Sequence, residues 1–202
     1  MNNQTKILSA SSIQAIGTVV AALGTTSAII PEENLRDQLI VYGNLLQGTG
    51  NALLADTEEA GSFGRLGNQI QASGNIMVAS GYLIELNDET KTTLAIKGSL
   101  LQAVGGGVVL SAELEKPPSL LKVYNVSGNL LQIIGNSMQA MGGISMLRES
   151  GQKREENEQA RWLVQALGAI LSALVAQNEL LEENKKLKGF SDQDIKSFRD
   201  VN

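Results

Sequence analysis

The side chains that most often carry catalysis or bind metals are missing from this sequence of 202 residues, which contains neither histidine nor cysteine. A Ser-His-Asp triad, the usual His/Cys zinc sites and a disulfide framework are therefore excluded. Grouped carboxylates remain as candidates for acid and base roles. Each group lies near lysine or arginine at an expected helix end, which is typical of a solvated, salt-bridged surface; the groups are Glu113 with Glu115, Glu155 with Glu156, and Glu179 with Glu182 and Glu183. The sequence therefore predicts no enzyme, no metal site, no cofactor and no small-molecule ligand.

A second polar pattern is more regular, because glutamine followed three residues later by glycine recurs along the chain. Examples are "GNLLQGTGNALLA" at 43–55 and "GNLLQIIGNSMQAMG" at 128–142. Six copies occur at a spacing of about 30 residues, which is the signature of a repeat architecture. The motif residues are Gln14, Gly17, Gln47, Gly50, Gln71, Gly74, Gln102, Gly105, Gln132, Gly135, Gln165 and Gly168.

The period inside each copy indicates a helix. Glycine returns every seventh residue, and a large apolar residue lies three places after it, as Leu46 and Leu53 do in the second copy. Strands repeat every two residues, so this seam is helical. Glycine costs a helix about 1 kcal/mol, and we interpret the glycines as notches that let a neighbouring helix approach closely. The alternative is that they mark loops or bulges, above all in "VGGGVV" at 104–109.

Helix-start residues and charged turns divide the chain into six long helices. We expect them at about 5–27, 32–55, 58–84, 89–113, 118–148 and 152–187, with a short last helix from about 192 after a Ser191 cap. Short connections make sequential helices antiparallel neighbours. The prediction is an all-α fold: an up-and-down antiparallel bundle of six helices from a degenerate repeat at 1–190, with a short C-terminal capping helix at 191–202.

The motif glutamines fall near the midpoints of these helices, so an up-and-down array places them at nearly one level. The sequence thus predicts a central layer of buried amides, which must be hydrogen-bonded to one another or to backbone. The alternative is a solvated face, because glutamine is a good helix former.

Charge is placed between the helices rather than along them. The net charge of −5 gives no electrostatic reason to expect nucleic acid as a partner. Uncharged runs extend over 66–84 and 123–147, and such surface tends to contact something else. We expect a homo-oligomer formed through helix sides. The same runs match a bilayer core in length, but they are rich in Asn, Gln, Ser and Gly, and the mean hydropathy of the chain is −0.01.

The amino terminus loosely imitates a signal peptide. Because this stretch contains Gln14 and Gly17 in the repeat register, we expect it to be a retained first helix. An intracellular, cytoplasmic protein is therefore favoured, with membrane association as the alternative.

The "GN-x-φ-Q-x-x-GN" unit resembles that of uncharacterised repetitive proteins of spore-forming Gram-positive bacteria. The resemblance covers the second, third and fifth expected helices well, the fourth through "GSLLQAVGG", and the first and sixth only through Q-x-x-G. It implies a bacterial setting and no activity or site residues.

Three functional classes follow from these patterns. The favoured class is a non-enzymatic structural or self-assembling helical protein. The second is a membrane-active helical protein that inserts or forms pores. The third, an enzyme or carrier built in the bundle interior, is supported only by the glutamine layer.

Overall fold

The computed structural model describes residues 3–25, 27, 29–118, 120–148 and 185, and this part of the chain contains five helices and no strand. The all-α prediction is confirmed. The predicted helices at 152–187 and from about 192, with Gln165 and Gly168, lie outside the described residues. The helices are α1 (Asn3–Gly24), α2 (Glu33–Ala55), α3 (Phe63–Leu83), α4 (Asp88–Glu115) and α5 (Leu120–Arg148).

Local capping explains where α3 and α4 begin. The side chain of Ser62 accepts a hydrogen bond from the backbone N–H of Arg65, and Asn87 does the same for Thr90 at 2.8 Å. The predicted start of α3 at residue 58 is wrong by about one turn. Residues 56–61 form a turn instead, in which Gly61 has a φ of +83°, a conformation that glycine adopts without strain.

The "VGGGVV" stretch does not interrupt α4, which is continuous from Asp88 to Glu115. Loop or bulge formation at these glycines is therefore wrong. The helix ends only before Pro117 and Pro118, which lack the backbone N–H groups needed to extend it.

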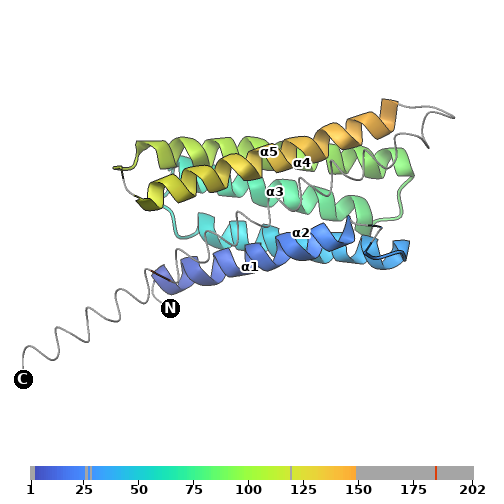
Figure 1. Cartoon of the computed structure of the whole chain (residues 1–202), viewed down its shortest axis with the longest axis horizontal. Helices are drawn as coiled ribbons and strands as arrows, with labels where there is room; N and C mark the ends of the chain where they lie inside the picture. Colours follow the sequence, from blue (N-terminus) through green and yellow to red (C-terminus); the bar gives the residue numbers. More distant parts are fainter. Residues whose placement is uncertain (1–2, 26, 28, 119, 149–184, 186–202) are drawn as a thin grey trace, which may run out of the picture.

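The helices lie lengthwise beside one another (Figure 1) and contact each other in chain order: α1 with α2, α2 with α3, α3 with α4, and α4 with α5. The backbones of no other pair of the described helices come into contact, so those of α1 and α5 do not meet. An ion pair between Lys6 at the start of α1 and Asp56 just after α2 shows that these helices run in opposite directions. A second ion pair, Asp37 with Lys91, lies at the opposite end.

Candidate functional site: an amide-lined interior

The five motif glutamines of the described helices are all buried. Their exposed fractions lie between 2% and 7%; they are Gln14, Gln47, Gln71, Gln102 and Gln132. The alternative that these glutamines lie on a solvated helix face is therefore wrong for the described helices. The largest fully buried side chains in the described part of the chain are Asn51 and Asn75, which are also amides.

The buried asparagines are functional-site candidates that the sequence reasoning missed. Each follows a glycine, and the repeated Gly-Asn pair was the available signal; they are Asn44, Asn51, Asn68, Asn75, Asn129 and Asn136. Two asparagines seven residues apart in one helix, such as Asn44 and Asn51, lie on the same helix face as the motif glutamine. Side-chain amides are therefore a large part of the bundle interior, beside buried alanines and aliphatic side chains such as Ile40 and Val78.

Two hydrogen bonds join amides from different helices. Gln14 Nε2 donates to Asn51 Oδ1 at 2.9 Å, linking α1 to α2. Gln102 Nε2 donates to Asn44 Oδ1 at 3.4 Å, linking α4 to α2, two helices whose backbones are not in contact. The amide nitrogen of Asn44 donates back to the carbonyl of Ile40. An asparagine can thus satisfy its own helix and still present an acceptor to the interior.

Described residues line three cavities of the interior, which we name after one lining residue each. The Gln71 cavity, of about 190 Å³, is also lined by Gln14 and Gln132. The Asn136 cavity, of about 40 Å³, is lined by Gln47 and Gln102. The Arg36 cavity measures about 240 Å³. The glutamines of α1, α3 and α5 thus line one cavity and those of α2 and α4 another, rather than forming a single layer.

Residues from all five helices line both the Gln71 cavity and the Asn136 cavity. The backbone of each described helix contacts only those of its neighbours in the chain, and all five helices contribute side chains to the walls of these cavities.

Some amide atoms in this interior have no hydrogen-bond partner among the described residues. They are Gln71 Oε1, Asn75 Oδ1 and Asn136 Nδ2, all on side chains that are at most 3% exposed. An unpaired buried polar group costs about 1–3 kcal/mol. The side chains of Gln71 and Asn136 lie on the walls of cavities.

The glycines of the motif lie where helix backbones approach closely. A Cβ atom added at Gly17 would lie 2.6 Å from the carbonyl oxygen of Gly43 across the α1/α2 interface. At Gly74 it would lie 2.6 Å from the carbonyl oxygen of Gly98 across the α3/α4 interface. Gly50 and Gly105 have similarly close contacts, and Gly135 is buried in α5.

The apolar residues of the seam do not form the centre of the bundle. Those in the described helices are all half-buried on the helix flanks: Ile13, Val20, Leu46, Leu53, Ile70, Met77, Leu101, Val108, Leu131 and Met138. Other large apolar side chains point outward on every helix, with exposed fractions between 57% and 67% for Ile16, Tyr42, Ile76, Val104 and Met141. The polarity of a water-soluble bundle is inverted here.

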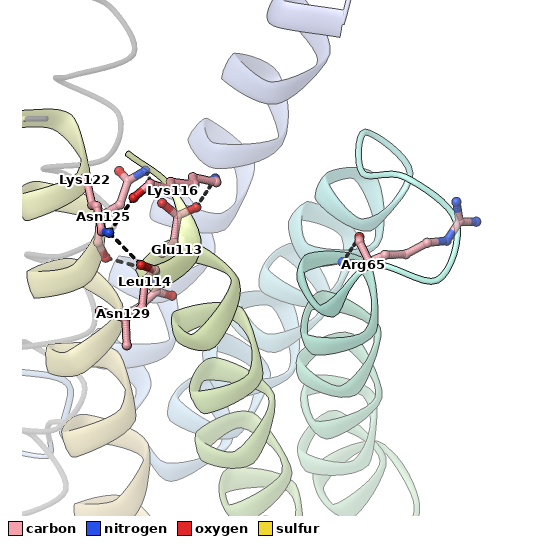
Figure 2. A network of polar contacts seen from close by, with 8 residues as sticks. Arg65, Glu113, Leu114, Lys116, Lys122, Asn125 and Asn129 are labelled. Atoms are coloured by element: carbon pink, nitrogen blue, oxygen red, sulfur yellow. Dashed lines mark hydrogen bonds and ion pairs between the residues drawn. The ribbon is translucent and has the colours of Figure 1, made fainter. Parts of the chain in front are cut away.

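A polar network at the turn between α4 and α5 (Figure 2) contributes residues to the wall of the Gln71 cavity. Glu113 is buried, forms an ion pair with Lys116 and accepts a hydrogen bond from Asn125 Nδ2 at 3.2 Å. Lys122 donates to the carbonyls of Leu114 and Lys116. Glu113 is therefore held by structural contacts, whereas Glu115 is exposed. The other two carboxylate groups lie outside the described residues.

The Arg36 cavity at the opposite end has charged walls. Arg36 donates to the carbonyls of Ile30 and Pro31. The ammonium of Lys91 pairs with Asp37 and lies 4.3 Å from the centre of the Tyr82 ring. Both ends of the interior are thus charged, while the middle is neutral. The described residues contain no group of three or more acidic, His or Cys residues that could hold a metal ion.

Two of the described helices, α1 from Thr5 and α4, are long and apolar enough to cross a membrane. Less than half of either apolar stretch is buried inside the protein. Length and composition alone do not separate such helices from the core helices of soluble proteins.

The fold and site define a class: an all-helical protein with amides in its interior and large apolar side chains exposed on every described helix. Residues 5–173 match DUF6944, described as a family of unknown function, and the chain belongs to this family. Comparison with curated proteins and with solved structures gives no match.

Proposed function

We propose that the protein is a membrane-embedded helical bundle whose apolar outer surface faces lipid. The observation that carries the proposal is the inverted polarity: many asparagine and glutamine side chains are buried, and every described helix exposes large apolar side chains. In water this distribution is unfavourable on both counts, because it exposes apolar surface and buries polar groups. In a bilayer the apolar surface costs nothing, and the amides are withdrawn from hydrocarbon.

The alternative of self-association in water explains the outer surface less completely. A two-fold dimer covers one side of each copy, but the exposed apolar residues lie on all five helices. Lipid can cover every side at once. This difference leads us to prefer the membrane over the cytoplasmic, self-assembling protein that the sequence alone favours.

The uncharged length of the helices supports the proposal. Charged residues are absent from 7–24 in α1, 38–55 in α2, 66–83 in α3, 98–112 in α4 and 123–147 in α5. At 1.5 Å per residue, the 18 residues from 38 to 55 span about 27 Å, close to the hydrocarbon thickness of about 30 Å. The shorter segment of α4 is bounded by Lys97, whose long side chain can extend its ammonium toward the surface.

The outward hydroxyl groups also suit an apolar environment. Thr49, Ser73 and Ser111 are exposed, yet each donates to a carbonyl oxygen of its own helix, three or four residues back, at 2.7–2.9 Å. Serine and threonine can satisfy themselves in this way within membrane helices.

A charge placed on the outer surface tests the proposal. Val104 is 58% exposed and lies in the uncharged segment of α4. In a bilayer, Val104→Lys should cost about 2.5–3.5 kcal/mol of insertion free energy. We expect the parent to float with lipid vesicles and resist alkaline carbonate extraction from membranes, and the variant to lose both properties. The matched control is Leu35→Lys, at an exposed apolar position beside Glu33 and Arg36, which should insert like the parent. A parent that stays in solution without detergent would refute the proposal.

Self-assembly through helix sides remains the second candidate, favoured by one feature of α3. Gln69 is exposed in the uncharged zone, one turn before Ser73. An exposed amide in hydrocarbon is costly unless a protein surface covers it. Lateral contact between copies at this face would remove that cost, and light scattering of the purified protein would measure the assembly.

We also propose that α1 to α5 and residues 152–187 derive from one repeated helical unit that completes a six-helix array. Support comes from the buried glutamine and glycine at equivalent positions of each described helix and from the absence of backbone contact between α1 and α5. Gly168→Leu should then destabilise the protein by about 1–3 kcal/mol, as overpacking does. Unchanged thermal melting would show that the sixth copy is not equivalent to the others.

A further inference from the structure

We infer that the interior of the bundle is a path for water and uncharged solutes of similar size, running from one charged end to the other. This inference rests on the membrane-embedded location proposed above. It is carried by three features of the interior: cavities that follow one another along the helices, buried amide side chains with unpaired atoms on the cavity walls, and a neutral constriction at the centre.

The cavities follow one another along the helices. Ser99, Tyr82 and Gln139 line both the Asn136 cavity and the Arg36 cavity, so these two are adjacent. The Gln71 cavity begins one helical turn further along. Gln132 lines it and Asn136, four residues later on α5, lines the next cavity. Likewise on α1, Gln14 lines the Gln71 cavity, and Thr18, four residues later, lines the Asn136 cavity.

The unpaired atoms supply sites along this path. Gln71, which lines the wide Gln71 cavity, carries an unpaired acceptor, and Asn136, which lines the narrow Asn136 cavity, carries an unpaired donor. A molecule that can both donate and accept a hydrogen bond satisfies each in turn as it moves. Buried polar groups are normally paired, so each of these unpaired atoms needs an explanation.

The constriction determines what can pass. The Asn136 cavity, of about 40 Å³, has room for about one water molecule. The hydrogen bond from Gln102 to Asn44 joins opposite walls there. None of its described lining residues is charged, so an ion would lose its hydration without a compensating charge. Water exchanges hydrogen bonds with the amides and passes, whereas ions are excluded.

Single cysteines can report the environment at chosen positions because the chain has none of its own. Ser99→Cys is nearly isosteric and places a thiol on the Asn136 and Arg36 cavities at a residue that is 5% exposed. Val104→Cys places a thiol on the outer surface at a residue that is 58% exposed. Both full-length variants are reconstituted into lipid vesicles and treated with hydroxyethyl methanethiosulfonate, a small uncharged thiol reagent. Only thiols that can ionise in contact with water react rapidly.

The expected order of reactivity is the reverse of the order of exposure. The thiol of Ser99→Cys should react at least about tenfold faster than the thiol of Val104→Cys, because the first faces water inside the bundle while the second faces lipid. If neither thiol reacts, the protein is embedded in the membrane but water does not enter its interior. That result refutes the water path and leaves the membrane location standing. If the Val104→Cys thiol reacts faster, the outer surface faces water, and the membrane location and the path both fail.

Water flow provides the functional measurement. Vesicles containing the parent should shrink faster than protein-free vesicles after an osmotic shock, in stopped-flow light scattering, and show no added potassium conductance. Modifying the thiol of Ser99→Cys should return shrinkage to the protein-free rate, and the reagent should leave the parent unaffected. Shrinkage that is unchanged by this modification, or a potassium conductance, would overturn the inference.

Discussion

Two kinds of helix interface hold the described bundle together. In one kind the helix backbones contact each other, and in the other the contacts involve side chains. At the α1/α2 and α3/α4 interfaces, glycines allow backbone to meet backbone: a Cβ added at Gly67 would lie 2.6 Å from the carbonyl oxygen of Gly105. At the α2/α3 interface, a Cβ at Gly48 would lie 3.3 Å from the Cβ of Asn75, and at α4/α5 one at Gly106 would lie 3.0 Å from Ile133 Cγ1. These contacts involve side chains.

This difference shows that one sequence pattern has two structural uses. Close backbone approach makes α1 with α2, and α3 with α4, into tightly packed hairpins that gain van der Waals and Cα–H···O contacts. Side-chain packing between the hairpins can adjust by rotamer changes, which backbone contacts cannot. We therefore expect glycine substitutions to be costly within a hairpin and mild between hairpins.

The largest expected effect is that of Gly74→Leu at the α3/α4 interface. Its Cβ would lie 2.6 Å from the carbonyl oxygen of Gly98, so the two helices must separate. Overpacking of this kind costs about 1–3 kcal/mol, and thermal melting followed by circular dichroism would measure it. Gly48→Ala is the matched control between hairpins, where the ordinary helix preference for alanine offsets a mild contact. Equal melting temperatures for the two variants would remove the distinction between the interfaces.

The three consecutive glycines of α4 offer a finer version of the same comparison. A Cβ at Gly105 would lie 2.7 Å from the backbone oxygen of Gly67, one at Gly106 would lie 3.0 Å from an Ile133 side-chain carbon, and one at Gly107 would have no atom within 4 Å. Alanine should therefore destabilise at 105, change little at 106, and stabilise by about 0.5–1 kcal/mol at 107. Equal melting temperatures for the three alanine variants would contradict the prediction that the cost of a substitution follows the space around each glycine.

The sequence predicted the helical class and the burial of the glutamines because both follow from short-range periodicity. Gly17 and Gln14 recur at fixed offsets in every copy, and a seven-residue period fits only a helix. The start of α3 was misplaced because Thr57 and Ser62 are both good capping residues. Only the left-handed turn at Gly61 decides between them, and that depends on the path of the connection.

The sequence did not predict the inverted polarity of the bundle. The seam residues such as Leu46 and Met77 are half-buried, whereas the motif glutamines are buried. Periodicity fixes which residues share a helix face, but not which face points inward. The division of the glutamines between two cavities likewise depends on how adjacent helices are offset, which no single helix encodes.

The smallest effect is expected at the ion pair between Lys6 and Asp56, which joins the ends of the tight α1/α2 hairpin at the surface. Asp56 caps the carboxyl end of α2, where the helix dipole disfavours negative charge. The hydrogen bond and the charge of Lys6 nevertheless hold the pKa of Asp56 below its ordinary value of 3.8. Since the folded pKa is lowered, the contribution to stability is present above pH 3.8 and is lost as the pH falls through the folded value.

Lys6→Gln tests this balance, because it leaves the Asp56 carboxylate at the helix end without its partner. We expect Lys6→Gln to melt slightly below the parent at pH 7 and the difference to vanish in acid, where Asp56 is protonated in both proteins. Lys6→Gln combined with Asp56→Asn should recover part of the loss, because the uncompensated charge is then gone. The whole effect should stay well below that of Gly74→Leu, because an exposed pair is screened by solvent whereas the glycine contact is made by backbone. A melting difference that persists in acid would mean that Lys6 acts through packing of its aliphatic chain on α2 and not through its charge.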